Sequence, residues 1–489
     1  MTAAQLVAGV DSSTQSCKVE LRDAITGTLI ASGSATHPPV FPPISEQDPE
    51  MWWSAFVHAF RAALASTGAA ADSVVAISVA AQCHGLVTLD STDTVIRPAK
   101  LWNDTTSAPD IAQLRQKIGD ETLLRSVGTL PTSAFTIGKL AWLARNEPAH
   151  LSRIAHILLP HDYLTFRLTG AYVTDRSEAS GTGYFDAARN AYLPNFLDLI
   201  TTDLDWDTVL PEVLAPDAAA GTVRPAVLEE LGLHGTVTVG AGGGDQHATA
   251  LGLGIRPGDV VYSFGTSGVV SALSRTPVYD LTGAVDGVAD MTDGFMPLVS
   301  TLNAAKVTDT FARILGVDHA TLSSLALAAD TSDIGPVLAA FLDGERTPDR
   351  PGATGLLSGI TSATTREQIA RSAYEGVVLG LASGQRQLEQ MGVSTDGTII
   401  AVGGGAKSPA YTQILADVLQ REIFTADVPE STARGAAVQA AAVAAGASVV
   451  SVRDEWAPET TIIAQPRTHT RDPWQRYTAT ASVTTLDRQ

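Results

Sequence analysis

The chain of 489 residues is 45% hydrophobic and 17% charged. At roughly 150 residues per domain, this length predicts about three units or two large ones, with ample apolar material for buried cores. Its 32 Lys and Arg against 52 Asp and Glu leave a formal net charge of −20. That balance argues against broad nucleic-acid binding and against polybasic attachment to anionic membranes, but it permits an anionic small ligand held by backbone N–H groups and a metal ion.

Cysteines and apolar segments narrow the class further. Cys17 and Cys83 are too few for a disulfide framework and are compatible with a reduced cytosol. Asp11 interrupts the apolar N-terminal stretch, which carries no basic segment, so no secretory signal is expected. The Ala-rich run 436–450 is shorter than the roughly 20 residues of a membrane span. We therefore expect a soluble cytoplasmic protein, and the oligomeric state stays open, a homodimer included.

The first half of the chain alternates strands and helices, as α/β layers do. Apolar runs, alternation and turn residues indicate these elements in chain order: a strand at 6–10, a polar turn at 11–16, a strand at 17–21, a helix beginning at Asp48-Pro49 and a buried strand at 74–79. The last strand ends in Gln82-Cys83-His84-Gly85.

The second half repeats this order. It contains a strand at 259–264, a turn at 265–268, a strand at 269–273, a buried strand at 398–402 and a helix at 409–419. The repetition predicts a duplicated α/β core, with a domain boundary near 252–258 that divides the chain into 1–252 and 253–489. We expect the last forty residues to be a peripheral extension.

The two hairpin turns have the composition of anion sites. Ser13 and Thr14 in the first turn correspond to Gly265, Thr266 and Ser267 in the second, and turns with successive free N–H groups bind phosphates. Either turn alone is more simply a hairpin, whereas two similar turns in corresponding halves favour phosphate binding. Asp11, at the end of the first strand, is placed to approach Mg²⁺, which prefers oxygen ligands.

Two further loops contain consecutive glycines. Gly242-Gly243-Gly244 precedes Asp245, which is either a general base or the N-cap of the following helix; the local pattern alone favours the cap. The second loop, Gly403-Gly404-Gly405-Ala406, is either a tight strand-to-helix connection or a backbone passing beneath a nucleotide. It does not fit the dinucleotide fingerprint, and the sequence has no P-loop motif.

Polar groups suited to a polyhydroxylated ligand follow the strand at 74–79. His84, Trp102, Asn103 and Asp104 offer hydrogen bonds and an apolar face, although each taken singly is more simply a structural residue. His247 is of interest because it neighbours Asp245, and the other histidines are left as core or surface residues.

Together these passages resemble the FGGY carbohydrate kinases, in particular the members that phosphorylate xylulose. The resemblance runs from Val7 to about Val443 in the same order. It rests on these segments: SEQDPEMWW (45–53), QCHG (82–85), LWND (101–104), LLPHDYLTFRLTG (158–170), GGGDQ (242–246), SFGTSGV (263–269), DGERTP (343–348) and GGGAKSP (403–409).

The resemblance implies two actin-like, ribonuclease-H-like domains, each with a central mixed sheet, and a catalytic cleft between them. It implies transfer of a phosphoryl group from Mg·ATP to D-xylulose, giving D-xylulose 5-phosphate. Asp245 matches the catalytic base, which changes its interpretation from cap to base and cap, and Asp11 matches the acidic residue that supports Mg²⁺. The implied sugar contacts are Cys83, His84, Asn103 and Asp104, and the implied nucleotide contacts are Ser13, Thr14, Gly265, Thr266, Ser267, Gly403, Gly404, Gly405 and Ala406.

Two departures from the family pattern leave alternatives open. Cys83 stands where these kinases usually have Met, which puts the exact sugar in doubt, and the turn at 11–16 lacks a common glycine. A kinase for ribulose, another ketopentose or a pentitol therefore remains an alternative. An actin-like ATP-binding sugar sensor is disfavoured because Asp245 and Asp11 are both present, and no DNA-reading module is visible.

Overall fold

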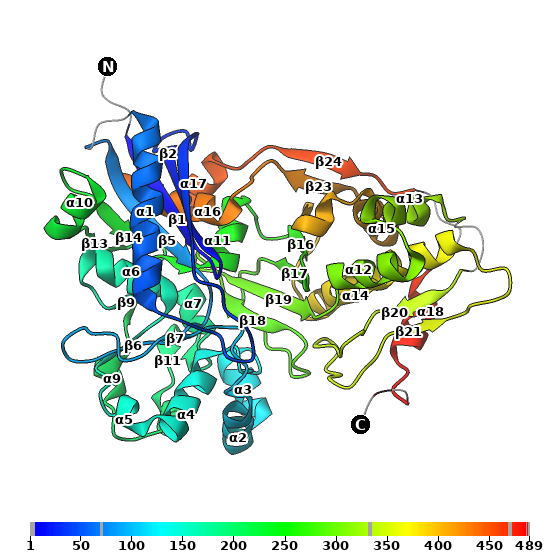
Figure 1. Ribbon diagram of the computed structural model, residues 1–489, viewed down its shortest axis with the longest axis horizontal. Coiled ribbons are helices and arrows are strands. Elements are labelled where there is room, and N and C mark those ends of the chain that lie inside the picture. The colour runs from blue at the N-terminus through cyan, green and yellow to red at the C-terminus, as the bar shows by residue number, and fades with distance from the viewer. Residues whose placement is uncertain (1–4, 69–71, 331–334, 468–471, 486, 488–489) are drawn as a thin grey trace.

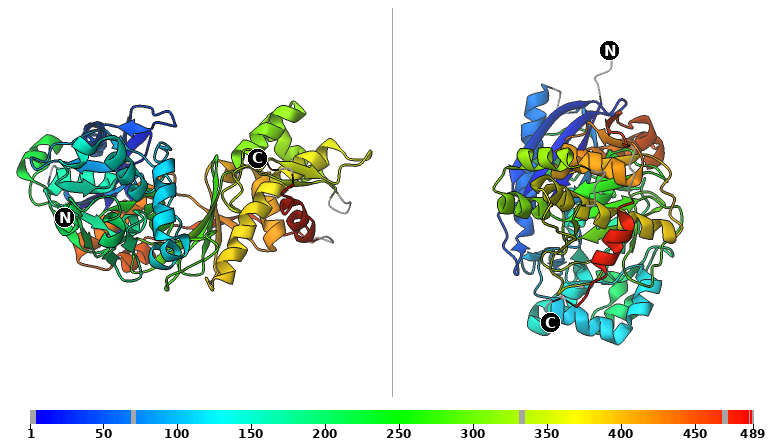
Figure 2. Two further views of the ribbon diagram at one scale, coloured as in Figure 1. Left: turned by 90° about the horizontal axis from the view of Figure 1, so that it is seen from below. Right: turned by 90° about the vertical axis from the view of Figure 1, so that its right-hand side faces the viewer.

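The computed structural model describes residues 5–68, 72–330, 335–467, 472–485 and 487. Two lobes lie side by side along the long axis, the first half of the chain forming the left lobe of Figure 1. Seen from below, the lobes meet at a narrower region that strands of the second half cross (Figure 2). Each lobe is built on one seven-stranded mixed sheet, as the α/β two-domain prediction requires.

The two sheets share one topology, which confirms the duplicated core. In the first, the order is β13 (Ala219–Thr222), β14 (Thr238–Gly240), β5 (Val74–Ala81), β1 (Leu6–Ser12), β2 (Ser16–Asp23) and β3 (Leu29–Thr36), with β15 (Gly243–Gly244) also paired to β5. In the second, taken in the same direction, it is β24 (Thr460–Ala464), β23 (Ile423–Ala426), β22 (Ile399–Val402), β16 (Val260–Phe264), β17 (Gly268–Ala272) and β19 (Phe295–Thr301), with β18 (Asp286–Ala289) added beyond β19. The strand directions also correspond: β1 and β16 each pair antiparallel with the next strand and parallel with β5 or β22.

A long helix covers the hairpin strands of each sheet. Helix α1 (Pro49–Thr67) packs on β2 and β3, and α14 (Arg366–Gln390) packs on β17 and β19. As predicted, Asp48 caps α1 by accepting from the Glu50 N–H at 3.0 Å, and Pro49 begins the helix. Trp52 and Phe56 are fully buried. The apolar face that the sequence predicts for this helix is therefore the face that packs on the sheet.

The Ala-rich run of the second half packs on the sheet of the first. It forms α16 (Ser431–Ala445), which contacts β1, β5 and α11 (Asp245–Gly252). A Cβ on Gly435 would overlap the backbone oxygen of Ala248, so only small residues permit this approach of the two helices. The alanines are thus explained by close packing. Among the described residues no single helix is long and apolar enough to cross a membrane; α16 and α17 (Val449–Glu455) reach that threshold only together, across a bend of 119°.

The expectation of a peripheral terminal extension was wrong for its described part. Residues 460–464 form β24, which pairs antiparallel with β23 as the edge strand of the second sheet. Helix α18 (Trp474–Ala481) packs on α14 and β20 (Val337–Ala339), and Arg350 forms an ion pair with Asp487. Apolar alternation is weak in a short edge strand, which is why composition alone suggested an extension.

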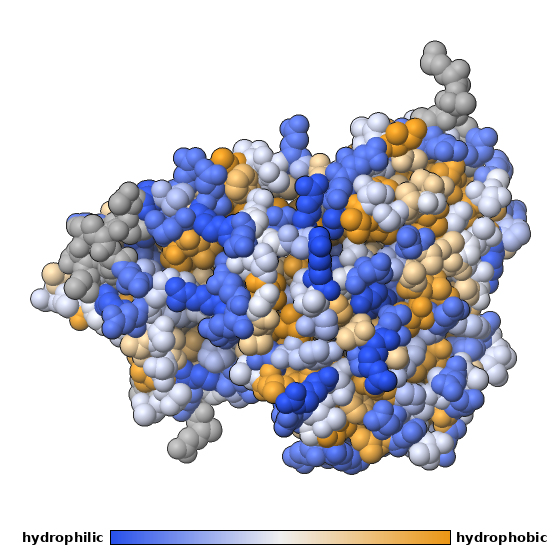
Figure 3. Space-filling view, turned by 180° about the vertical axis from the view of Figure 1, so that it is seen from behind, coloured by the Kyte–Doolittle hydropathy of each residue, from blue (hydrophilic) through white to orange (hydrophobic). Residues whose placement is uncertain are grey.

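Polar contacts join the lobes on one side of the sheets. Helix α7 (Arg176–Ser180) of the first lobe contacts β18 of the second, and Ser180 Oγ accepts from the Ala289 N–H at 3.0 Å. Arg176 donates to the backbone oxygens of Thr292 and Gly294. On the face shown in Figure 3, strongly hydrophilic residues lie along the middle of the molecule, between the lobes. The interface therefore combines these polar contacts with an apolar cluster, in which Ala179 and Phe185 of the first lobe pack with Ala289 and Phe295 of the second.

The remaining elements complete the two lobes shown in Figure 1. The helices are α2 (Ala108–Ile118), α3 (Asp120–Val127), α4 (Thr136–Asn146), α5 (Pro148–Leu151), α6 (Pro160–Thr169), α8 (Pro194–Leu197), α9 (Trp206–Val209), α10 (Pro225–Leu231), α12 (Ala305–Leu315), α13 (His319–Ala328) and α15 (Pro409–Leu419). Short two-stranded sheets pair β4 (Glu46–Gln47) with β7 (Ala99–Lys100), β6 (Val87–Leu89) with β8 (His156–Leu158), β9 (Val173–Asp175) with β12 (Glu212–Leu214), β10 (Phe185–Asp186) with β11 (Ala191–Tyr192), and β20 with β21 (Leu356–Ser358).

Candidate functional site

Three loops of the first lobe meet because three strands end at the same edge of its sheet. Strands β1 and β15 both run parallel to β5, and Ala81 at the end of β5 pairs with Ser12 and with Gly244. The residues just beyond or at these ends include Asp11, Cys83 and Asp245. Carboxyl ends of parallel strands are where α/β proteins gather their ligands.

Asp11 is buried at the end of β1. The Ser13 hydroxyl donates to Asp11 Oδ1 at 2.5 Å, and Ser12 continues the strand without a left-handed φ, so the missing glycine strains nothing. Burial, helped by the nearby Asp245 carboxylate and opposed by the Ser13 hydrogen bond, raises the pKa of Asp11 from 3.8 to about 7. A buried and a half-buried carboxylate so placed repel each other unless a proton or a cation compensates the charge.

The other residue predicted in this turn, Thr14, belongs to a hydrogen-bonded chain. Its hydroxyl donates to Gln82 Oε1 at 3.0 Å and accepts from the indole N–H of Trp102 at 3.0 Å. Trp102 is 46% exposed, so this chain ties the first turn to an open aromatic surface. Thr14 and Ser13 are themselves half-buried.

Asp245 is the first residue of α11 rather than its cap. The N-cap of α11 is Gly244, which has no side chain to cap the helix. The prediction of Asp245 as the N-cap was therefore wrong by one residue. Its Oδ1 accepts from the Gln246 N–H at 2.8 Å and from the Cys83 thiol at 3.3 Å. Burial raises the pKa of Asp245. A carboxylate with a raised pKa therefore lies at the N-terminus of α11 and contacts Cys83, in the loop that follows β5.

The glycines before Asp245 make room for large neighbours. Gly242 has a left-handed φ of 87°, and a Cβ there would lie 2.5 Å from His161 Nδ1. The Gly242 N–H donates to Gln439 Oε1 at 2.8 Å, and the Gln439 amide donates back to the Gly242 oxygen at 3.2 Å. Gln439 also accepts from Ser78 at 2.5 Å. A fully buried side chain of α16 thus fixes the loop that presents Asp245.

His84 occupies a strained turn directly after Cys83. Its φ is 62°, in the left-handed region, and its ring stacks on Phe135 with centroids 5.0 Å apart. Its backbone N–H donates to Glu178 Oε2 at 2.9 Å, which holds the turn. Burial, with Lys139 nearby, lowers the pKa of His84 to about 3. The imidazole is therefore neutral; its side chain is 20% exposed and its Nδ1 lies 3.9 Å from Glu178 Oε1.

Asn103 and Asp104 differ in their surroundings. Asp104 is fully buried and accepts from the Ser45 N–H at 2.8 Å, from the Thr106 N–H at 3.0 Å and from the Lys100 ammonium at 3.2 Å. This carboxylate anchors the loop. Asn103 is half-buried, and its Oδ1 has no hydrogen-bond partner among the described residues.

The second turn and the second glycine loop meet at the corresponding edge of the other sheet. Strands β16 and β22 run parallel, with Ser263 opposite Val402. A Cβ on Gly403, whose φ is 86°, would lie 2.7 Å from the Phe264 oxygen, and a Cβ on Gly405 equally close to Phe264 Cβ. The loop residues Gly403 and Gly404 are exposed, as are Thr266 and Ser267, while Gly265, Gly405 and Ala406 are half-buried. Backbone N–H groups of Ala304 and Ala305 hold the turn by donating to the oxygens of Thr266 and Gly265.

Sequence reasoning missed several buried polar residues beside Asp245. Burial raises the pKa of Glu178, on α7, to about 8 and lowers the pKa of Lys139, on α4, to about 7. Burial lowers the pKa of His161, but Asp162 and Asp175 outweigh it and raise that pKa to about 9. No local motif reveals these residues, because they reach the site from helices distant in sequence. His247, which the sequence did single out, is buried here as well.

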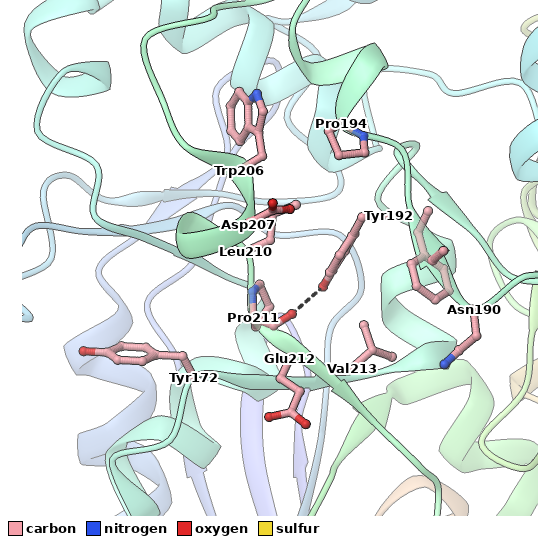
Figure 4. A pocket seen from close by; sticks show the side chains of 12 residues that line it. Tyr172, Asn190, Tyr192, Pro194, Trp206, Asp207, Leu210, Pro211, Glu212 and Val213 are labelled. Atoms are coloured by element: carbon pink, nitrogen blue, oxygen red, sulfur yellow. Dashed lines mark hydrogen bonds between the residues drawn. The ribbon is translucent and has the colours of Figure 1, made fainter.

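A separate cavity of about 500 Å³ lies in the lower part of the first lobe. The side chains in Figure 4 come from β10, β11, β12, α8, α9 and the loops beside them, with Tyr192 donating to the Pro211 oxygen at 2.9 Å. None of the predicted site residues lines it. The cavity is therefore distinct from the two strand edges described above.

The chain matches family models over most of its length. Residues 6–252 match the N-terminal domain, and residues 260–444 the C-terminal domain, of the FGGY family of carbohydrate kinases. The chain belongs to the FGGY family of carbohydrate kinases. The FGGY match agrees with the paired sheets and with the two-domain fold expected from the resemblance.

Individual FGGY proteins are similar over nearly the whole chain. A xylulose kinase of Streptomyces rubiginosus is 39% identical over 459 residues, which cover 93% of this chain and 92% of that protein. The crystal structure of a xylulose kinase from Bifidobacterium adolescentis superposes with a TM-score of 0.88 at 38% identity, covering 97% of this chain and 99% of that one. A gluconate kinase from Lactobacillus acidophilus, at 21% identity and a TM-score of 0.86 over 98% and 96% of the two chains, shows the shared fold alone.

Proposed function

We propose that the protein is an ATP-dependent D-xylulose kinase that forms D-xylulose 5-phosphate. The observation that supports it most is the 39% identity to a xylulose kinase across 93% of the chain. The geometry adds a half-buried carboxylate, Asp245, within 3.3 Å of the Cys83 thiol at the edge where three strands end. Phosphoryl transfer is mostly positioning and charge stabilisation, and this arrangement provides both.

In this proposal Asp245 is the general base. It takes the proton of the terminal sugar hydroxyl, whose oxygen attacks the γ-phosphorus while the bond from that phosphorus to the β–γ bridging oxygen breaks and ADP leaves. The burial that raises the pKa of Asp245 brings its basicity closer to working pH, which is where a general base is most effective. Its bond from the Gln246 N–H keeps the carboxylate oriented at the start of α11.

The sugar lies, in this proposal, against Cys83, His84, Asn103 and Asp104. His84 is neutral and partly exposed, so it can accept from or donate to a hydroxyl, and the unpartnered Asn103 Oδ1 can accept another. Asp104 acts through its loop, because its carboxylate is already bonded to Ser45, Lys100 and Thr106. We assign sugar binding and the base to 1–252 and most of the nucleotide contacts to 253–489.

The donor groups fit a magnesium nucleotide. Asp11 offers a buried carboxylate oxygen near the Asp245 carboxylate, and Mg²⁺ prefers carboxylate oxygens. Ser13, Thr14, Gly265, Thr266 and Ser267 would contact the phosphates, and Gly403, Gly404, Gly405 and Ala406 the adenosine side. Bound there, Mg²⁺ would neutralise charge on the phosphates. Asp11 would hold the cation, and the polar contacts between α7 and β18 join the lobes around the site.

The test is sugar-dependent ADP release with Mg·ATP, compared across D-xylulose, D- and L-ribulose, glycerol and common pentitols. A preference for D-xylulose supports the proposal. A preference for another ketopentose or a pentitol keeps the kinase and assigns the change of specificity to the region from Cys83 to Asp104. Absence of turnover with every sugar, together with ATP binding, overturns the proposal in favour of a sensor.

A further inference from the structure

Three potential metal ligands converge beside Gly244. Cys83 follows β5, Glu178 lies on α7 and His247 on α11, and their ligand atoms all lie within 4.8 Å of one another. A Cβ on Gly244 would lie 2.6 Å from His247 Nδ1, 2.7 Å from Glu178 Oε1 and 3.0 Å from Cys83 Sγ. Because Gly244 has no side chain, the space between these three ligand atoms stays open.

The carboxylate and imidazole atoms of this cluster are buried and lack hydrogen-bond partners. Glu178 is fully buried and His247 is 5% exposed. Glu178 Oε1 and both ring nitrogens of His247 have no hydrogen-bond partner among the described residues. His84 Nδ1, 3.9 Å from Glu178 Oε1, has none either. Buried polar atoms are almost always bonded, so four such atoms in one place indicate a missing ligand.

We propose that Cys83 Sγ, Glu178 Oε1 and a ring nitrogen of His247 bind one borderline-soft divalent cation of the Zn²⁺ class. Thiolate, imidazole and carboxylate are the ligands such ions select, and His84 or water completes four-coordination. Mg²⁺ takes oxygen ligands and does not compete here, so this site differs from the one proposed at Asp11. The thiol proton of Cys83 passes to solvent when the sulfur coordinates the ion.

Occupation of this site alters the groups that the sugar requires. The Cys83 thiol that donates to Asp245 Oδ1 at 3.3 Å would be lost as a donor, and the ion would stand next to the base. Zn²⁺ therefore inhibits phosphorylation in competition with the sugar. This inhibition rests on the proposed kinase function, whereas binding of the ion does not.

Binding is tested by Co²⁺ titration of the full-length, metal-free protein, followed by absorption. We expect one equivalent of Co²⁺ to give a near-ultraviolet thiolate-to-cobalt band and the visible bands of four-coordinate cobalt, all removed by Zn²⁺. Cys83→Ser should lose the thiolate band, and His247→Ala should weaken binding by at least about tenfold. The matched control is Cys17→Ala, since Cys17 is a buried cysteine of β2 and should leave the band intact.

Several results would overturn the proposal. The proposal fails if the wild-type protein gives no thiolate-to-cobalt band. It also fails if the band persists in Cys83→Ser or is lost in Cys17→Ala. Circular dichroism checks that each variant is folded, and His247→Asn replaces His247→Ala if the latter is not.

The inhibition is measured separately as ADP release at saturating Mg·ATP with buffered micromolar Zn²⁺. Wild type should be inhibited, a chelator should reverse this, and His247→Ala should need at least about tenfold more Zn²⁺ relative to its own uninhibited rate. Cobalt binding without turnover on any sugar means that the proposed function fails while the site stands. Cobalt binding with turnover that is insensitive to Zn²⁺ refutes the inhibition.

Discussion

The buried carboxylate of Asp11 should make the unliganded protein less stable as the pH rises. Its pKa is raised from 3.8 to about 7, so the protonated form stabilises the fold. That contribution is complete below the unfolded pKa and is lost as pH rises through the folded pKa. A shift of roughly three units corresponds to about 4 kcal/mol in total. Roughly half of it, about 2 kcal/mol, is lost between about pH 5.5 and about pH 8.

Asp11→Asn removes this titration while keeping size and an acceptor for the Ser13 hydroxyl, which donates to Asp11 at 2.5 Å. The variant should therefore gain stability over wild type as the pH rises, by about 2 kcal/mol or roughly 4–8 °C in melting temperature across that interval. Thermal unfolding is followed by circular dichroism with a chelator present, so that no cation compensates the charge. Asp396→Asn, which changes an exposed carboxylate, is the matched control.

Parallel melting curves for Asp11→Asn and wild type at every pH would refute this reasoning. Asp11 would then ionise in the folded protein as easily as in the unfolded chain, and the idea of an uncompensated carboxylate pair with Asp245 would fail. A gap that opens in the opposite direction, with wild type gaining at high pH, would mean that the charged form is the stabilised one.

Three further variants probe the site. Asp245→Asn should lower kcat by about 10²–10⁴ while calorimetry shows ATP and sugar still binding; lost sugar binding would indicate a structural role. Gly181→Ala places a Cβ on the His84 ring, so the KM for sugar should rise by at least about tenfold with the KM for ATP unchanged, and an equal rise in both would contradict this. Gln439→Leu leaves both polar groups of Gly242 unpaired and should cost about 2–4 kcal/mol and lower kcat more than it raises KM. Gln439→Glu keeps the acceptor oxygen but faces the oxygens of Pro216 and Gly242 with a carboxylate, so it should lose less only as the pH falls and the carboxyl is protonated; equal losses at every pH would refute the role of that acceptor.

Local sequence determined the elements and the loops that flank the sheets. Apolar runs and turn residues are properties of neighbouring residues, so β1, β5, β16 and β22 were predicted nearly to the residue, and Asp48 was predicted correctly as the cap of α1. The repetition of these patterns also indicated the duplication, which the matching strand orders confirm. The roles assigned to the glycine loops and to Asp245 stay predictions.

Only the tertiary structure decided what surrounds those loops. Glu178, Lys139 and Gln439 reach the first-lobe site from helices up to hundreds of residues away, and Gln439 does so because α16 packs on the other lobe's sheet. The position of β24 likewise depends on pairing with β23 and not on its own pattern. Burial sets the pKa values of Asp11 and Glu178, and burial is a sum over contacts distant along the chain. Sequence periodicity reports which face of a segment is apolar, whereas the identity of the polar groups buried against one another is fixed only when the segments pack.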